Sequence, residues 1–141
     1  MTAAASCEIE IRVPYADVDQ MGCVYHANYL KYFEQGRTEL LRKNGWAYRE
    51  LEAAGTYFVV TKARCNYHSP AGYDELLRLT TKLKRVTLAR IDHHYELRRK
   101  EDGQLLSSGE TTLACVNGDG QVVPMPEGLK RPKPQRNVCT E

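Results

Sequence analysis

Residues 15–46 read YADVDQMGCVYHANYLKYFEQGRTELLRKNGW and join a short acidic turn to a long helical pattern. Apolar positions recur in this stretch at steps of four, three and four, which predicts an amphipathic helix with one buried stripe: Tyr29, Phe33, Gly36 and Leu40. We expect Asn28 to be the N-cap and Gly45 to follow the helix end. A mid-helix glycine costs about 1 kcal/mol relative to alanine. Another element is therefore expected to pack closely against Gly36.

The acids of the turn, Asp17 and Asp19, are two residues apart, so their side chains are expected to point in opposite directions. An acid beside the free N–H groups of a helix start can attack an acyl carbon or deprotonate a water. The amides near His26 would hold the negative oxygen that forms, which is worth about 3–4 kcal/mol in well-studied cases. The same acids can equally serve only to cap the helix or shape the turn. Spacing alone leaves both interpretations open.

The rest of the chain alternates with period two, which indicates β-strands. Strands are expected at 8–13, 57–68, 77–88, 91–97 and 105–116, with a short helical turn at 47–54. The phase slips near Arg85, which predicts a bulge. In 57–68, strict alternation would place Val59 on one face and Phe58 and Val60 on the other. The full sets are Tyr57, Val59, Ala63, Cys65 and Tyr67 against Phe58, Val60, Lys62, Arg64 and Asn66.

This order predicts an α+β fold, in which an antiparallel sheet packs on one long helix. Residues 1–141 are expected to form a single domain with a core at about 8–123. The remainder, 124–141, is rich in proline and bases and is expected to be extended or disordered. One helix covers only one sheet face, so a homodimer is the simplest way to cover the rest.

Composition narrows the function classes. The formal net charge is +2, from 20 bases and 18 acids, which argues against nucleic-acid binding as the main activity. No apolar run is long enough for a membrane span, and the N-terminal MTAAASCEIE lacks the features of a secretory signal. The five cysteines form no CxxC pair, which favours a reduced, cytoplasmic setting: Cys7, Cys23, Cys65, Cys115 and Cys139.

The run YADVDQMGCVYHANYLKYFEQGRTELLR resembles the signature of the 4-hydroxybenzoyl-CoA thioesterase family, in particular its small bacterial acyl-CoA thioesterase branch, the YbgC-like proteins. That signature has the form Asp-x-Asp-x-x-Gly-x-Val-(Tyr/Trp)-(His/Tyr)-x-(Asn/Ser)-Tyr, followed by an aromatic-rich helix with Arg-Thr-Glu near its end. The likeness continues in Phe58-Val59-Val60 and in Tyr67-x-x-Pro70-Ala71. It covers about residues 8–123.

The resemblance implies the hotdog fold, a five- to six-stranded antiparallel sheet wrapped around one long helix. It implies that Asp19 is the catalytic nucleophile or general base, that the His26 backbone N–H is the oxyanion donor, and that Asp17 is structural. The His26 side chain and Tyr15 match positions that contribute to catalysis, whereas Asn28 and Tyr29 match positions without an assigned role. Family members dimerise edge to edge and often form tetramers, with sites at subunit interfaces. The strand segment that matches the acyl-pantetheine channel comprises Val59, Val60 and Thr61.

The sequence also contains two rival candidate sites. Cys23 lies inside the motif, but no general base adjoins it in sequence, and cysteine commonly fills apolar space. Asp92-His93-His94 suggests a metal site, but neighbouring histidines on a strand face opposite ways, so no metal is expected. The phosphates of coenzyme A need bases, and the strands offer Lys62, Arg64, Lys84, Arg85, Arg90, Arg98 and Arg99.

The sequence thus predicts a cytoplasmic acyl-CoA thioesterase that uses Asp19, His26 and Tyr15 and has no cofactor beyond the coenzyme A of its substrate. Acyl-carrier protein is a second candidate carrier, and a homodimer or tetramer is expected. Two alternatives stay open: a non-catalytic acyl-thioester binding or assembly module, and a hotdog dehydratase, which typically places its acid elsewhere. The sequence does not separate short, long and aromatic acyl groups.

Overall fold

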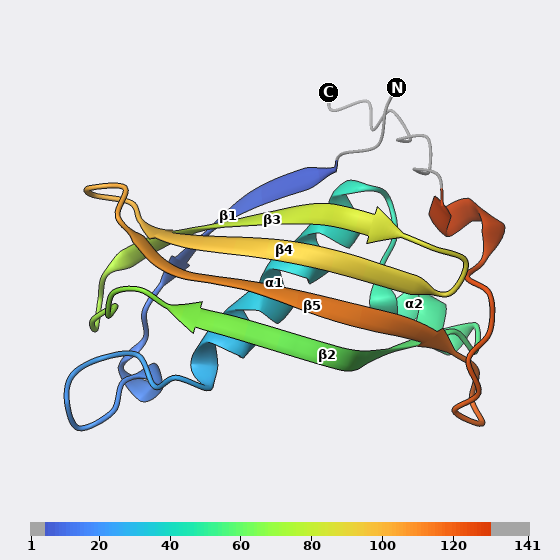
Figure 1. The fold of residues 1–141 in the computed structure, drawn as a ribbon, viewed down its shortest axis with the longest axis horizontal. Coiled ribbons are helices and arrows are strands. Elements are labelled where there is room, and N and C mark those ends of the chain that lie inside the picture. The colour runs from blue at the N-terminus through green and yellow to red at the C-terminus, as the bar shows by residue number, and fades with distance from the viewer. Residues whose placement is uncertain (1–4, 131–141) are drawn as a thin grey trace, which may run out of the picture.

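A computed structural model describes residues 5–130 and shows a five-stranded antiparallel sheet with one long helix against it (Figure 1). The strand order is β1-β3-β4-β5-β2, so β1 and β2 are the sheet edges. The elements, in chain order, are β1 Ser6–Arg12, η1 Tyr15–Asp17, α1 Asn28–Lys43, α2 Tyr48–Ala53, β2 Tyr57–Tyr67, β3 Leu76–Val86, β4 Arg90–Arg99, β5 Leu105–Val116 and η2 Glu127–Lys130. The predicted α+β class and element order are confirmed. Neither described α-helix has the length and apolar character that a bilayer span needs.

Helix α1 packs on the inner face of the sheet through the stripe that the sequence predicts, because Tyr29, Phe33, Gly36 and Leu40 are all buried. The Phe33 ring stacks on the Tyr95 ring of β4, with centroids 4.4 Å apart and planes 7° apart. Periodicity therefore identified the core face of the helix correctly.

Two glycines let the helix and the sheet approach closely. A Cβ atom at Gly36 would lie 2.2 Å from the Thr81 hydroxyl oxygen of β3, so the expected close packing is confirmed. At Gly109 of β5, a Cβ atom would lie 2.5 Å from the Phe33 ring and 2.5 Å from the Arg64 carbonyl oxygen. Both positions must lack a side chain for the helix and the sheet to pack this closely.

Strand β2 corrects the predicted alternation. The register between β2 and β5 skips Thr61, so that Val60 pairs with Leu113 while Lys62 pairs with Thr112. This bulge reverses the phase, and Phe58 and Val60 share the inner face with Cys65 instead of opposing it. The bulge expected near Arg85 is confirmed, because the register between β3 and β4 shifts between Leu83 and Arg85.

The ends of α1 differ in how well they were predicted. Asn28 is not the N-cap: the helix begins at Asn28, Ala27 precedes it, and the Asn28 side-chain amide donates to the Asp17 carbonyl oxygen instead. The other end is as expected. Gly45 has a φ of +87° and donates to Arg42, while the Trp46 amide donates to Leu41, which is a Schellman motif.

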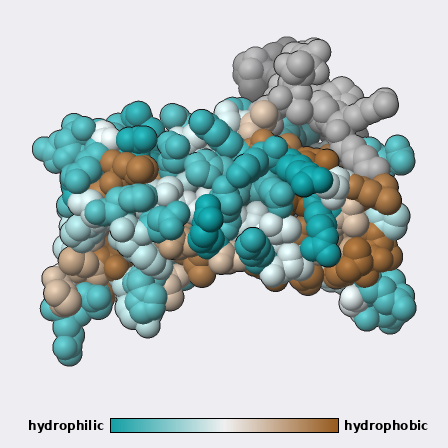
Figure 2. Space-filling view, in the orientation of Figure 1, coloured by the Kyte–Doolittle hydropathy of each residue, from teal (hydrophilic) through white to brown (hydrophobic). Residues whose placement is uncertain are grey.

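The outer face of the sheet is largely hydrophilic over its middle, with hydrophobic residues toward both ends (Figure 2). Glu110 of β5 lies at the centre of a charged group on this face. Its carboxylate accepts a hydrogen bond from Lys84 at 2.7 Å and pairs with Arg64 at 3.4 Å and His94 at 3.8 Å. No helix of residues 5–130 covers this face, so the charged side chains described here are exposed to water.

The tail prediction needs correction for its first residues. Met125 is buried, and its amide donates to the Leu88 carbonyl oxygen at 2.9 Å. Gly128, in the short 3-10 helix Glu127–Lys130, lies against the Trp46 ring. Residues 124–130 therefore contact the body of the protein through Met125 and Gly128. The rest of the predicted tail, with Cys139, lies outside the described residues.

Candidate active site

The Asp19 turn (residues 18–24) projects beside the start of α1. Val18 and Val24 form an antiparallel bridge, the Asp19 amide donates to Cys23 at 2.9 Å, and the Gly22 amide donates to Asp19 at 3.0 Å. Gly22 has a φ of +78°, which glycine adopts without strain. Asp19 is exposed, and its Oδ1 accepts from the Met21 amide at 2.9 Å. No donor among residues 5–130 reaches Oδ2. The turn thus presents one free carboxylate oxygen.

Asp17 is buried whereas Asp19 is exposed, so the two acids differ as expected, but Asp17 lies in the 3-10 helix Tyr15–Asp17 and not in the extended turn that the period-two argument assumed. The Asp17 carboxylate is buried under α1, accepts a hydrogen bond from the Tyr32 hydroxyl at 2.8 Å, and lies 3.6 Å from the Lys31 ammonium. Burial first, and the adjacent carboxylate second, raise the pKa of Tyr32 well above its ordinary value. Tyr32 therefore stays a neutral donor, and Asp17 has no free oxygen to offer a substrate.

The helix start is tied to the acidic turn through backbone groups. The Asp17 carbonyl oxygen accepts from the Tyr25 amide at 2.9 Å and from the Asn28 side chain at 2.9 Å. The His26 N–H donates to no acceptor among residues 5–130, and the His26 carbonyl oxygen accepts from the Tyr67 hydroxyl at 2.9 Å. These hydrogen bonds to the Asp17 carbonyl oxygen therefore join the segment that carries the free Asp19 carboxylate to the segment that carries the free His26 N–H.

Tyr15 is 77% exposed at the start of the short 3-10 helix Tyr15–Asp17. Its ring packs edge-on against the Tyr73 ring, with centroids 5.5 Å apart. No contact among the described residues links the Tyr15 side chain to Asp19 or His26.

The predicted channel segment lies at the far end of β2 from the acid. Val59, Val60 and Thr61 sit at the bulge, and Val59 and Val60 are exposed at the sheet edge. Tyr67, at the other end of the strand, is the residue that contacts His26. Seven residues of strand span about 23 Å. One chain alone therefore does not bring the channel segment to Asp19.

The surroundings of the two rival sites, Cys23 and the run Asp92-His93-His94, argue against both. The Cys23 thiol has one hydrogen-bond partner among the described residues, the Met21 carbonyl oxygen at 3.8 Å, and no base adjoins it. His93 is buried on the inner face, while His94 lies on the outer face beside Glu96 and Glu110. Within residues 5–130 no group of three potential metal ligands occurs.

The candidate bases for coenzyme A differ in whether a carboxylate already pairs with them. Arg64 and Lys84 share Glu110, Arg98 pairs with Glu96, and Arg99 pairs with acids from two loops. No carboxylate of the described part of the chain pairs with the other three: Lys62, Arg85 and Arg90.

Sequence reasoning missed the contact between Tyr67 and His26 and the network around Arg99. The abundance of tyrosine, nine residues against two phenylalanines, was the available signal, because a buried or packed hydroxyl needs a partner. It did not show which tyrosine meets which partner. No comparable signal marked Arg99, whose partners are distant in sequence.

Comparisons with known proteins identify the family of this chain. The model of the thioesterase-like superfamily matches residues 13–132. The acyl-CoA thioester hydrolase YbgC of Escherichia coli is 33% identical over 76% of this chain and 79% of its own length. The acyl-CoA thioesterase YbgC of Haemophilus influenzae is 36% identical over 85% and 88%. The crystal structure of the DHNA-CoA thioesterase from Staphylococcus aureus superposes with a TM-score of 0.82 at 30% identity, covering 84% of this chain and 80% of that one.

Proposed function

This chain belongs to the thioesterase-like superfamily and has the hotdog fold, and we propose on that premise that it hydrolyses an acyl-CoA thioester to a free acid and coenzyme A. The observation that carries the proposal is the exposed Asp19 carboxylate. One of its oxygens has no donor among the described residues, and its turn is hydrogen-bonded to the start of α1.

In the proposed reaction, Asp19 acts on the thioester carbonyl carbon in one of two ways. Its Oδ2 attacks the carbon directly, expels the coenzyme A thiolate and leaves an acyl–aspartate anhydride that water opens. Alternatively, Asp19 takes a proton from a water that attacks the carbon. In both routes the carbonyl oxygen becomes negative, and the His26 N–H is proposed to stabilise it. Tyr15 and the His26 side chain are proposed to contact the thioester.

A second copy of the chain is proposed to complete the site. Strand β2 is an 11-residue sheet edge with several exposed large apolar side chains, and such edges favour pairing with another strand. Antiparallel pairing of two β2 strands would bring Val60 of one copy toward the end of the other, where Tyr67 contacts His26. The site is therefore proposed to form across a homodimer, which can pair again into a tetramer.

Two bases are proposed to hold the coenzyme A phosphates. The first base, Arg90 of β4, pairs with Ala114 of β5, which also pairs with Val59 of β2. Arg90 and Val59 therefore lie on one row across the outer face, about 10 Å apart. Lys62 lies just past the bulge from Val59. Neither base pairs with a carboxylate of residues 5–130, so the positive charge of each is available to a phosphate.

The chemistry proposed needs no cofactor besides the coenzyme A in the substrate, and an acyl-carrier protein thioester is a second candidate substrate. A cytoplasmic setting is proposed because the four cysteines of the described residues are all free thiols. The length and type of acyl group are to be found by measuring relative kcat/KM across short, long and aromatic acyl-CoA thioesters.

The central test compares wild type with Asp19→Asn on that panel. Asparagine keeps an oxygen for the Met21 amide, so the turn is preserved while the nucleophile or base is lost. We expect kcat to fall at least about 100-fold with an unchanged melting temperature. Turnover by Asp19→Asn equal to wild type would refute the mechanism. No turnover by wild type on any thioester would favour the binding module instead.

Two further variants complete this test. Cys23→Ser is expected to keep wild-type turnover, and its inactivity alone would revive a thiol mechanism. Val60→Lys places a charge on the β2 edge and is expected to give a folded monomer with little activity. Light scattering after size exclusion measures the assembly, and an active monomer would refute the shared site.

A further inference from the structure

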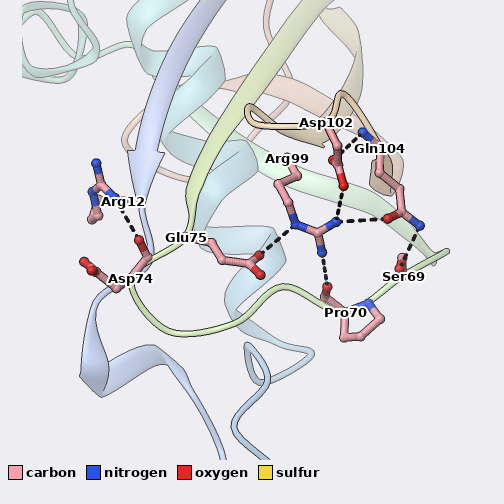
Figure 3. A network of polar contacts seen from close by, with 8 residues as sticks. All are labelled: Arg12, Ser69, Pro70, Asp74, Glu75, Arg99, Asp102 and Gln104. Carbon is pink, nitrogen blue, oxygen red and sulfur yellow. Dashed lines mark hydrogen bonds and ion pairs between the residues drawn. The ribbon is translucent and has the colours of Figure 1, made fainter.

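Arg99, the last residue of β4, joins two loops through its guanidinium group, the β2–β3 connection and the β4–β5 hairpin (Figure 3). Nε donates to Glu75 at 3.3 Å, Nη2 donates to the Pro70 carbonyl oxygen at 3.2 Å, and Nη1 donates to Asp102 at 3.0 Å and Gln104 at 2.9 Å. The Arg99 side chain is only 18% exposed. Four of the five N–H donors of its planar fork are thus engaged with groups from separate parts of the chain.

Two of these partners bracket the 70–75 segment, which connects β2 to β3 and is fastened at both sides. On one side, the Val13 amide donates to Glu75 and the Asp74 amide donates to Val13, both at 3.0 Å. Arg12 also donates to the Asp74 carbonyl oxygen at 2.8 Å. Asp74 has a φ of +66°, a conformation that surrounding contacts must hold for a residue other than glycine.

On the other side, the 70–75 segment holds the Asp19 turn. The Val24 amide donates to the Ala71 carbonyl oxygen at 2.8 Å, and Cys23 forms an antiparallel bridge with Gly72. The Cys23 carbonyl oxygen in turn accepts a hydrogen bond from the Asp19 amide at 2.9 Å. A continuous path of hydrogen bonds and peptide links therefore runs from Arg99 through the 70–75 segment to Asp19.

We propose that Arg99 is a positioning residue that holds the Asp19 turn in place through the 70–75 segment. The inference rests on the proposed function, because it takes Asp19 as the reactive acid. The Arg99 guanidinium fixes the Pro70 carbonyl and the Glu75 carboxylate together, and the segment between them bonds the turn. Small shifts of a reactive group are costly: a misplacement of about 1 Å can lower a rate about 100-fold.

Arg98 provides a matched comparison on the same strand. Its side chain pairs with Glu96 at 3.4 Å and donates to the Gly103 carbonyl oxygen at 3.1 Å, and it touches no atom of the 70–75 segment. Arg98→Ala therefore removes an arginine of the same hairpin without touching the path to Asp19.

The experiment compares wild type, Arg99→Ala, Arg99→Lys and Arg98→Ala by steady-state kinetics and by amide hydrogen exchange of the full chain. Arg99→Ala is expected to lower kcat about 10- to 100-fold while KM changes less than about twofold. The Val24 amide, which donates to Ala71, is expected to exchange at least about tenfold faster. Arg98→Ala is expected to change neither. Arg99→Lys keeps the charge but not the fork, so an intermediate loss is expected.

Each outcome decides the inference. A kcat of Arg99→Ala within about twofold of wild type, or Val24 exchange unchanged, would overturn it. So would an equal loss in Arg98→Ala. Where Arg99→Ala does not fold, Arg99→Lys carries the same comparison. The exchange measurement needs no turnover, so a wild type that hydrolyses no thioester refutes the proposed function and still leaves the positioning role to be decided by Val24.

Discussion

The helix–sheet layer and the Asp19 turn are held by different interactions. In the layer, which is formed by the inner faces of α1 and the strands, Phe33 stacks on Tyr95 and both rings are fully buried. In the turn, backbone hydrogen bonds fix the chain, while Asp19 is exposed and Met21 is 87% exposed. The layer depends on the shapes of its side chains, and the turn depends on main-chain bonds that leave the side chains of Asp19 and Met21 exposed. Stability and reactivity can therefore be changed separately.

The largest expected loss of stability is in the layer. Gly109→Ala places a Cβ atom 2.5 Å from the Arg64 carbonyl oxygen and 2.5 Å from the Phe33 ring. Backbone cannot yield as a side chain can, so we expect a loss of about 3 kcal/mol or more in the free energy of unfolding. Denaturant unfolding monitored by circular dichroism measures it.

Gly118→Ala is the matched control, since nothing lies within 4 Å of the Cβ atom it would add. It is expected to change the free energy of unfolding by less than about 0.5 kcal/mol. A Gly109→Ala protein as stable as Gly118→Ala would contradict the close contact between α1 and β5.

His93 is a buried base inside the layer, and its burial makes stability depend on pH. Burial, and to a lesser degree the nearby Arg37 charge, lower the pKa of His93 from 6.5 to about 4, while Asp92 opposes the shift. His93 Nδ1 has no hydrogen-bond partner among the described residues. The unfolded chain binds a proton at His93 between pH 6.5 and 4 and the folded protein does not. Stability is thus complete above pH 6.5 and falls as the pH drops, by up to about 3 kcal/mol near pH 4.

This effect is isolated by the difference between wild type and His93→Gln. Unfolding free energies at several pH values are expected to fall less steeply for His93→Gln over this window. His94→Gln, which alters a partly exposed histidine on the outer face, should keep the wild-type slope. Equal slopes for wild type and His93→Gln would show that His93 is not buried in its neutral form.

Asp17 is expected to affect stability, as residues of the layer do, and not turnover, as Asp19 of the turn does. Asp17→Asn removes the charge that accepts the Tyr32 hydroxyl at 2.8 Å, and we expect a loss of about 2 kcal/mol in unfolding free energy. Well below the melting temperature, kcat should stay within about threefold of wild type. Asp19→Asn should show the reverse pattern. A severe loss of kcat in folded Asp17→Asn would give the buried acid a direct part in catalysis.

The sequence was informative where a local period or a long motif determines the structure. The stripe of α1, including Gly36, followed from helix geometry. The different surroundings of Asp17 and Asp19 were expected from an extended turn, although Asp17 lies in a 3-10 helix. The bulge at Thr61 did not, because Val59-Val60-Thr61 is a run of β-branched residues that fits either face of a strand. The role of Arg99 could not be predicted either. Its partners Glu75 and Pro70 lie 24 and 29 residues away and meet it only in the folded chain.

The smallest expected effect tests a side chain that joins β2 to the start of α1. Tyr67 is 52% exposed, its ring packs edge-on against Tyr29, and its hydroxyl donates to the His26 carbonyl oxygen. Tyr67→Phe keeps the ring and deletes this bond, so we expect about 1 kcal/mol or less in stability and a two- to fivefold fall in kcat, roughly what one neutral hydrogen bond is worth. Tyr57→Phe is the control on the same strand, because its hydroxyl has no partner among residues 5–130. If both variants lose kcat equally, the His26 contact does not orient the helix start. If Tyr67→Phe alone loses kcat, the helix start that carries the His26 N–H depends on a side chain as well as on backbone bonds.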